Sequence, residues 1–288
     1  MTPLLEYRTD LAGYSTRVLE LKGRGPAILL LHGYADSADT WRPVLRLLGR
    51  RDQRALAVDL PGFGTASRLH RGEKILPQLD RFAAAAVEYL VSEDGGPVVV
   101  AGNSLGGAVA LRLGERPELF LAGVVPVAPA GLDMPRWFGA VERDPLLRAL
   151  LAIPVPLPER AVRAVVGQAY RNLAFARPQA VAPEVVSAFT GHHRDRPTVA
   201  RYLDTARRML PELRDPFRLE EVRCPVLLVW GKRDRMVSHR GAQLVTTALP
   251  DTTYELIEDC GHCPQLEVPE RLVELLIEFA GAPARRAA

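Results

Sequence analysis

Five consecutive residues, Gly102 to Gly106, have types and a spacing that could carry out nucleophilic chemistry. They form the pattern G-x-S-x-G between an apolar run, Pro97–Ala101, and a helix-forming segment, Leu105–Glu115. Where a strand turns this abruptly into a helix, the serine adopts a strained backbone conformation and its hydroxyl points into a cleft. The pattern therefore predicts Ser104 as a nucleophile. The amide of Leu105, at the helix N-terminus, could stabilise a developing oxyanion.

A serine hydroxyl is a weak nucleophile unless a base removes its proton, so a histidine and an acid that orients it are required. His262 follows a predicted strand, Thr253–Ile257, in a loop that contains glycine. Asp234 occupies the corresponding loop after Pro225–Trp230. We therefore expect His262 as the base and Asp234 as its acid. Less suitable acids in the same region are Asp251 and Asp259.

The elements that would position these residues alternate between apolar strands and helix-period segments, a pattern typical of a mostly parallel sheet covered by helices. The expected strands are Ala27–Leu31, Ala55–Leu60, Pro97–Ala101, Leu121–Ala128, Pro225–Trp230 and Thr253–Ile257. The expected helices are Thr40–Arg50, Leu79–Val91, Leu105–Glu115 and Glu270–Ala280. Continuous apolar strands of this kind are buried on both faces, so the fold class is α/β.

Between residues 131 and 215 the strand pattern gives way to short, arginine-rich helical stretches interrupted by prolines. This segment is expected to be an inserted helical cap, with 1–130 and 216–288 forming the core. Substrate specificity would then depend on aromatic residues of the cap, and two adjacent histidines could line the cleft. These residues are Trp137, Phe138, Tyr170, Phe175, Phe189, His192 and His193.

Several motifs together resemble the α/β-hydrolase superfamily across nearly the whole chain outside the cap. They are HGYADSADTW, DLPGFG, GNSLGG, WGKRDRMV and GHCPQLEVPERL. The resemblance implies the α/β-hydrolase fold and the chain order serine, acid, histidine. It also implies that the amide of Tyr34 is a second oxyanion donor beside that of Leu105, and that His32 and Asp59 are structural.

The composition sets limits on location and partners. The net charge is +3, from 37 basic and 34 acidic residues with no basic block, so no nucleic-acid partner is expected. No apolar run approaches the roughly 18 to 20 residues of a membrane span, and the N-terminus lacks the apolar stretch of a signal peptide. Three cysteines are too few for a disulfide framework, which favours the cytoplasm. The oligomeric state stays open.

Two rival motifs point to other chemistry. Residues 62–67 begin like a dinucleotide fingerprint but have Ser67 in place of the third glycine, so no nucleotide cofactor is expected. Cys260 and Cys263 spell C-x-x-C around His262, but Pro264 follows at once where a thioredoxin-type motif continues into a helix. No fourth ligand completes a metal site there. A bond between the two thiols would restrain the His262 loop, and the sequence leaves this possibility open.

The resemblance implies a serine hydrolase that cleaves a carboxylic ester of a small molecule through an acyl-enzyme on Ser104, without a cofactor. One alternative is a carbon–carbon bond hydrolase of ring-cleavage products, because GNSLGG resembles the nucleophile motif of those enzymes. Two differences speak against this alternative. The residue after the predicted catalytic histidine is aromatic in those enzymes but is Cys263 here, and the loop after His32-Gly33 lacks the additional glycines that those enzymes have. Another alternative is a non-catalytic receptor for a small molecule.

Overall fold

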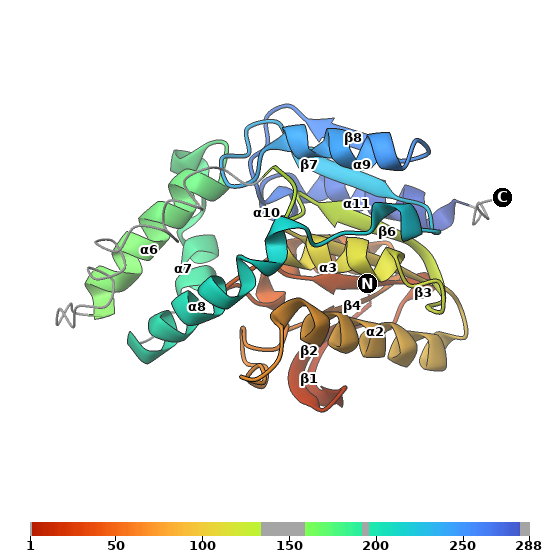
Figure 1. Cartoon of the computed structure of the whole chain (residues 1–288), viewed down its shortest axis with the longest axis horizontal. Helices are drawn as coiled ribbons and strands as arrows, with labels where there is room; N and C mark the ends of the chain where they lie inside the picture. The colour runs from red at the N-terminus through yellow and green to blue at the C-terminus, as the bar shows by residue number, and fades with distance from the viewer. Residues whose placement is uncertain (1, 134–158, 192–195, 283–288) are drawn as a thin grey trace.

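A computed structural model describes residues 2–133, 159–191 and 196–282 of the chain. Its centre is an eight-stranded sheet with the strand order β1-β2-β4-β3-β5-β6-β7-β8 (Figure 1). All pairings from β4 to β8 are parallel, which confirms the expected α/β class. The strands are β1 Leu4–Leu11, β2 Tyr14–Leu21, β3 Arg24–Leu31, β4 Gln53–Val58, β5 Val98–Asn103, β6 Leu121–Val127, β7 Leu227–Gly231 and β8 Thr253–Ile257.

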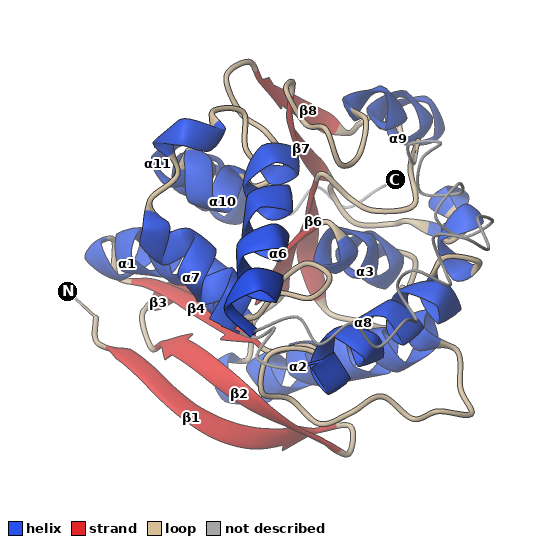
Figure 2. Cartoon of the chain, turned by 90° about the vertical axis from the view of Figure 1, so that its left-hand side faces the viewer, coloured by secondary structure: helices blue, strands red, loops and turns tan. Residues whose placement is uncertain are grey.

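Helices cover both faces of the sheet (Figure 2). Leu29 and Leu31 of β3 pack into one apolar cluster with α2 and α3, whereas Ile28 and Leu30 pack into the other with α1 and α11. This alternation follows from the two-residue period of a strand and explains why its apolar run is continuous. The helices are α1 Arg42–Arg50, α2 Ile75–Asp94, α3 Leu105–Gly114, α6 Glu159–Ala174, α7 Pro183–Gly191, α8 Arg196–Met209, α9 Ala242–Ala248, α10 Pro264–Glu267 and α11 Pro269–Gly281.

The six expected strands are confirmed, with ends shifted by at most three residues, but the sheet also contains an N-terminal hairpin that the sequence pattern did not predict. Strands β1 and β2 are antiparallel and joined through Ala12 and Gly13, both at positive φ, 49° and 80°. A two-residue loop with positive φ at both positions matches the right-handed twist of the strands that it joins. The hairpin was missed because β1 is an edge strand with mostly exposed or half-buried residues, so it shows no apolar run.

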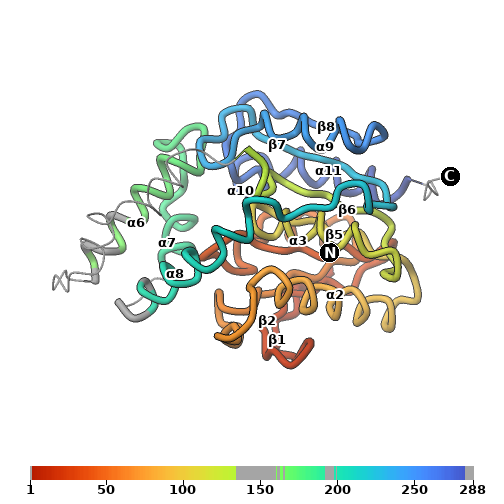
Figure 3. The backbone as a smooth tube through the Cα atoms, viewed as in Figure 1, coloured from red at the N-terminus to blue at the C-terminus, as the bar shows by residue number. Residues whose placement is uncertain are grey.

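Helices α6, α7 and α8 lie together at one side of the sheet, where α8 also contacts α2 (Figures 1 and 3). They belong to the segment 131–215. Residues 134–158 and 192–195 lie outside the described part of the chain, and with them Trp137, Phe138, His192 and His193. Among the helices that the structure describes, none is long and apolar enough to cross a membrane.

Candidate active site

Ser104 lies at the turn between β5 and α3, in the strained backbone conformation that the sequence predicts. Its φ and ψ are 53° and −111°, a region that residues with a side chain rarely adopt. The flanking glycines allow the close approach of neighbouring backbone. A Cβ on Gly102 would lie 2.2 Å from the carbonyl oxygen of Gly106, and one on Gly106 would lie 2.3 Å from that of Leu31. The turn therefore requires glycine on both sides of the serine.

His262 and Asp234, which follow β8 and β7, meet as expected. The Nδ1 of His262 lies 2.7 Å from Oδ2 of Asp234, and both side chains are almost fully buried. The carboxylate is itself fixed, because its Oδ1 accepts the amides of Met236 and Val237 at 2.7 and 3.0 Å. Trp230 donates its indole N–H to Oδ2 at 3.1 Å. Asp234 is thus held in one orientation before it contacts the imidazole.

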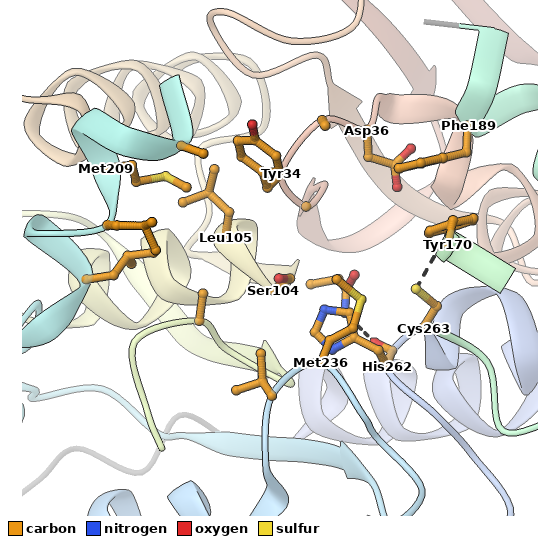
Figure 4. Close-up of a pocket in the computed structure, with 18 residues that line it drawn as sticks. Tyr34, Asp36, Ser104, Leu105, Tyr170, Phe189, Met209, Met236, His262 and Cys263 are labelled. Carbon is orange, nitrogen blue, oxygen red and sulfur yellow. Dashed lines mark hydrogen bonds between the residues drawn. The ribbon is translucent and has the colours of Figure 1, made fainter. Parts of the chain in front are cut away.

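The contact with Asp234 determines which nitrogen of His262 can act as a base. A carboxylate only accepts hydrogen bonds, so Nδ1 carries the proton in the neutral ring and Nε2 is left with a lone pair. Nε2 is buried and has no hydrogen-bond partner among the residues described. Both His262 and Ser104 line one cavity, in which Figure 4 shows the ring beside the serine. The geometry allows Nε2 to take a proton from a group in that cavity.

Among the histidines that the structure describes, His32 is also buried, but it has no nitrogen available for this role. Its Nδ1 donates to the carbonyl of Gly33 at 2.7 Å, and its Nε2 accepts the amide of Leu60 at 2.8 Å. His32 thereby connects the ends of β3 and β4. Asp59, the other residue assigned a structural role, accepts the amides of Ala38 and Thr65, each at 2.8 Å.

The two residues expected to supply oxyanion amides both line the cavity. Leu105 is the first residue of α3, where backbone N–H groups lack intrahelical acceptors. Tyr34 follows β3 in a loop that passes close to Ser104, since a Cβ on Gly33 would lie 3.4 Å from the Cβ of Ser104. The Tyr34 hydroxyl donates to the carbonyl of Tyr202 on α8. Of the five predicted site residues, four line this cavity: Tyr34, Ser104, Leu105 and His262. The fifth, Asp234, contacts His262.

The alternative acids do not reach His262. Asp259 is exposed and pairs with Arg177 and Arg233, at 3.2 and 2.6 Å. Asp251 lines a different depression, beside β7, β8 and α11. Within the described ranges, no group of three or more His, Cys, Asp or Glu side chains is arranged to hold a metal ion.

The loop that carries His262 is held by residues that the sequence did not single out for this purpose. Asn103, next to Ser104, donates its amide to the carbonyl of His262 at 2.8 Å. The amide of His262 donates to the carbonyl of Ala174, at the C-terminus of α6, at 2.7 Å. Glu267 accepts the amides of Gly261 and Ala176 at 2.7 and 2.8 Å. The loop is therefore fixed from the core on one side and from α6 on the other.

The cavity has a volume of about 220 Å³ and mostly apolar walls. Leu105 and Met236 line it from the core, and Met209 lines it from α8. Tyr170 of α6 and Phe189 of α7, two of the aromatic residues expected to determine specificity, also contribute, whereas Phe175 contacts Tyr170 edge-on with ring centroids 5.2 Å apart. Asp36 is a polar exception in this wall.

The two thiols beside His262 face different partners and are both free. Cys260 lies against the carbonyl of Gly261 and the Glu267 carboxylate, at 3.6 and 3.8 Å. Cys263 lies 3.8 Å from the Tyr170 hydroxyl. Burial raises the pKa of both thiols.

Residues 28–275 match the model of the alpha/beta hydrolase family. An uncharacterised protein of Mycobacterium tuberculosis is 28% identical over 294 residues, covering 96% of this chain and 81% of the relative. A monoacylglycerol lipase of Homo sapiens is 25% identical over 264 residues, covering 89% of this chain and 76% of the relative.

Solved structures share the fold. A 2-hydroxy-6-oxo-6-phenylhexa-2,4-dienoate hydrolase from Rhodococcus has a TM-score of 0.77 at 23% identity, covering 98% of this chain and 100% of that one. A serine hydrolase involved in carbazole degradation has a TM-score of 0.74 at 24% identity, covering 96% of this chain and 98% of the other.

Proposed function

Because the chain belongs to the alpha/beta hydrolase family, we propose that it is a serine hydrolase that cleaves a carboxylic ester of a small molecule through an acyl-enzyme on Ser104. The observation that carries the proposal is the state of His262. Its Nδ1 is fixed by Asp234 at 2.7 Å, while its buried Nε2 has no partner among the residues described. A base so oriented, in a cavity that a strained serine also lines, is suited to remove the serine proton.

In the proposed reaction the Ser104 oxygen attacks the ester carbonyl while Nε2 of His262 accepts the hydroxyl proton. Asp234 stabilises the imidazolium that forms and keeps the ring in the required tautomer. The amides of Tyr34 and Leu105 donate to the oxyanion of the tetrahedral intermediate. The imidazolium then protonates the leaving alcohol, and water hydrolyses the acyl-enzyme with the same histidine as base. Apart from the ester and this water, the proposed steps use only side chains and backbone amides of the protein.

The proposal includes an assignment of residues 131–215 as a cap over the cavity. Tyr170, Phe189 and Met209 from this segment line the cavity, so the segment would help to select the substrate. We also propose a cytoplasmic location, for which the unpaired thiols of Cys224, Cys260 and Cys263 are the support.

Carbon–carbon bond hydrolysis is the second candidate, favoured by the GNSLGG motif and by the fold shared with the dienoate hydrolase from Rhodococcus. A ring-cleavage product of that type carries a carboxylate. Among the described residues that line the cavity there is no Lys or Arg to bind a carboxylate, and Asp36 would repel one. The electrostatics of the cavity therefore favour an uncharged ester.

The proposal is tested with a fluorophosphonate, which labels activated serines, and with p-nitrophenyl esters of increasing chain length. We expect labelling at Ser104 and turnover of at least one ester, and neither in Ser104→Ala. A folded wild-type protein that is not labelled and hydrolyses no ester would exclude the proposed function and favour a receptor. Turnover of a dienoate ring-cleavage product without turnover of any ester would favour the second candidate.

A further inference from the structure

Asp36 is a buried acid in the cavity wall that the proposed mechanism does not use. It lies two residues after Tyr34, in the loop that follows β3, and only 7% of the residue is exposed. Its carboxyl group faces the cavity between Tyr34 and Phe189 in Figure 4. Among the described residues, no Lys or Arg pairs with it. A buried carboxylate without a cation is costly, so its presence needs an explanation.

Two neighbouring acids show how different Asp36 is. Asp39 and Asp59 are both bound by the Arg17 guanidinium, at 2.7 and 3.2 Å, and the pKa of each is lowered. For Asp39 the hydrogen bonds and charges of Arg17 and Arg42 outweigh the effect of burial, and for Asp59 the nearby His32 and Arg17 do so. For Asp36 burial dominates and raises the pKa to about 7, although the Ser37 amide and the Thr40 hydroxyl bind the carboxyl group. The carboxyl of Asp36 thus keeps acceptor capacity that the described residues do not use.

Tyr170 supplies a second polar group beside Asp36. Its ring stacks on Phe189 with centroids 3.8 Å apart and planes within 5°, which fixes where the hydroxyl lies. That hydroxyl lies 3.8 Å from the Cys263 sulfur, which makes a weak interaction. Burial is the main cause of its raised pKa, and the Asp36 charge is close enough to add to it. The two groups therefore form a polar corner in an otherwise apolar cavity (Figure 4).

We propose that Asp36 and Tyr170 form a subsite for a free hydroxyl group on the substrate. The substrate would then be a largely apolar ester that carries one hydroxyl away from the scissile carbonyl. This inference rests on the proposed function and specifies its substrate class. A hydroxyl fits both partners, because it can donate to the Asp36 carboxyl and accept from the Tyr170 O–H. It needs no fixed charge, so the fit holds for both protonation states of Asp36.

The subsite should discriminate mainly against substrates that lack the hydroxyl. An ester with a methyl group in its place would take water away from Asp36 and offer no hydrogen bond in return. Sites built to bind a buried hydroxyl reject such analogues strongly for this reason. We expect a preference of about tenfold to a hundredfold in kcat/KM for the hydroxyl-bearing ester.

The experiment compares esters that differ only by a hydroxyl in place of a terminal methyl group. One series varies the acyl chain, as ω-hydroxyacyl against acyl esters, and the other varies the alcohol, as monoesters of diols against esters of alkanols. In the wild type, we expect at least one series to show the preference. In Asp36→Leu the ratio of the two kcat/KM values should fall to about one. In the isosteric Asp36→Asn it should fall severalfold, because a neutral amide is a weaker acceptor.

The matched controls are Tyr170→Phe, which removes only the second partner and should lower the ratio by a smaller factor, and Asp259→Asn, an exposed acid outside the cavity, which should leave it unchanged. A wild-type ratio near one in both series would overturn the inference while leaving the esterase proposal intact. The same holds for a ratio that survives both Asp36 substitutions, or for a preference for an ammonium group over the hydroxyl. Absence of turnover and of labelling at Ser104 would instead reject the proposed function on which the inference rests.

Discussion

The Ser104 turn and the His262 loop meet at one cavity, but they are built in opposite ways. The turn is local, since five consecutive residues and two neighbouring strands determine the position of Ser104. It holds its serine by backbone strain, at φ 53° and ψ −111°. The position of the loop depends on contacts with residues from other parts of the chain. That position depends on Asn103, on Glu267 and on the carbonyl of Ala174 in α6.

This difference determines what substitutions should do in each region. Backbone strain at the turn lowers the stability of the protein but places the serine in the cavity. Relieving this strain should therefore stabilise the protein. The hydrogen bonds of the loop stabilise the fold and orient the base together, so removing one should lower stability and activity at once. At the Ser104 turn, the conformation that function requires therefore lowers stability. In the His262 loop, the same hydrogen bonds serve both function and stability.

The largest expected effect is at the turn, where Ser104→Ala and Ser104→Gly should each lower kcat by roughly 10⁴-fold or more, because both remove the nucleophile. Only glycine relieves the strain. We expect Ser104→Gly to be more stable than Ser104→Ala by about 1 kcal/mol, after the entropy cost of glycine. Ester turnover and thermal unfolding of the two variants measure this. Equal melting temperatures would show that the turn is not strained, and activity within tenfold of wild type would exclude Ser104 as nucleophile.

The next effect is behind the loop, at Asp234. We expect Asp234→Asn to lower kcat by about 10³- to 10⁴-fold with little change in KM, since an amide favours the wrong tautomer of His262. The matched control is Asp259→Asn, which replaces an exposed acid paired with Arg177 and Arg233. Steady-state kinetics of both variants decide the assignment. If Asp259→Asn impairs turnover and Asp234→Asn does not, the acid has been assigned to the wrong residue.

The same contrast explains what the sequence could reveal. The Ser104 turn was predictable because strand, glycines and helix are contiguous, so one short pattern contains the whole geometry. Asp234 and His262 were predictable because parallel strands bring their carboxyl ends to one edge. Asp36 and Glu267 were not, since their roles follow from burial and from partners far along the chain. Asn103 was recognised only as a position within the motif, and its bond to His262 depends on how the sheet brings the two loops together.

An intermediate effect is expected at Glu267, which joins the loop to α6. In Glu267→Gln one carboxylate oxygen becomes an NH₂ group, which cannot accept the amide of Gly261 or of Ala176. A lost buried hydrogen bond costs about 1 to 3 kcal/mol. We expect kcat to fall about tenfold to a hundredfold, with KM nearly unchanged and a lower melting temperature.

The control for Glu267 is Glu258→Gln, an exposed acid paired with Lys232, which should change neither quantity. Because the predicted change acts through the orientation of His262, Glu267→Asp should recover part of kcat, as it keeps two acceptor oxygens. A stable Glu267→Gln protein with wild-type kcat would show that the loop is positioned without the link to α6.

The smallest effect is expected for oxidation of the two cysteines beside His262, although a disulfide between them would restrain the base. Cys260 is fully buried against Gly261 and Glu267, while Cys263 is 3% exposed and faces Tyr170. Burial raises the pKa of both thiols, and the thiolate is the form that reacts with an oxidant. Bond formation would also require both sulfurs to leave their present partners.

We therefore expect diamide to change ester turnover by less than about twofold, in the wild type and in Cys260→Ser/Cys263→Ser alike. Turnover before and after diamide, with dithiothreitol added last, measures it. A loss that dithiothreitol reverses in the wild type alone would show that the loop opens enough to pair the thiols, and that its hydrogen bonds hold His262 less firmly than the strained turn holds Ser104.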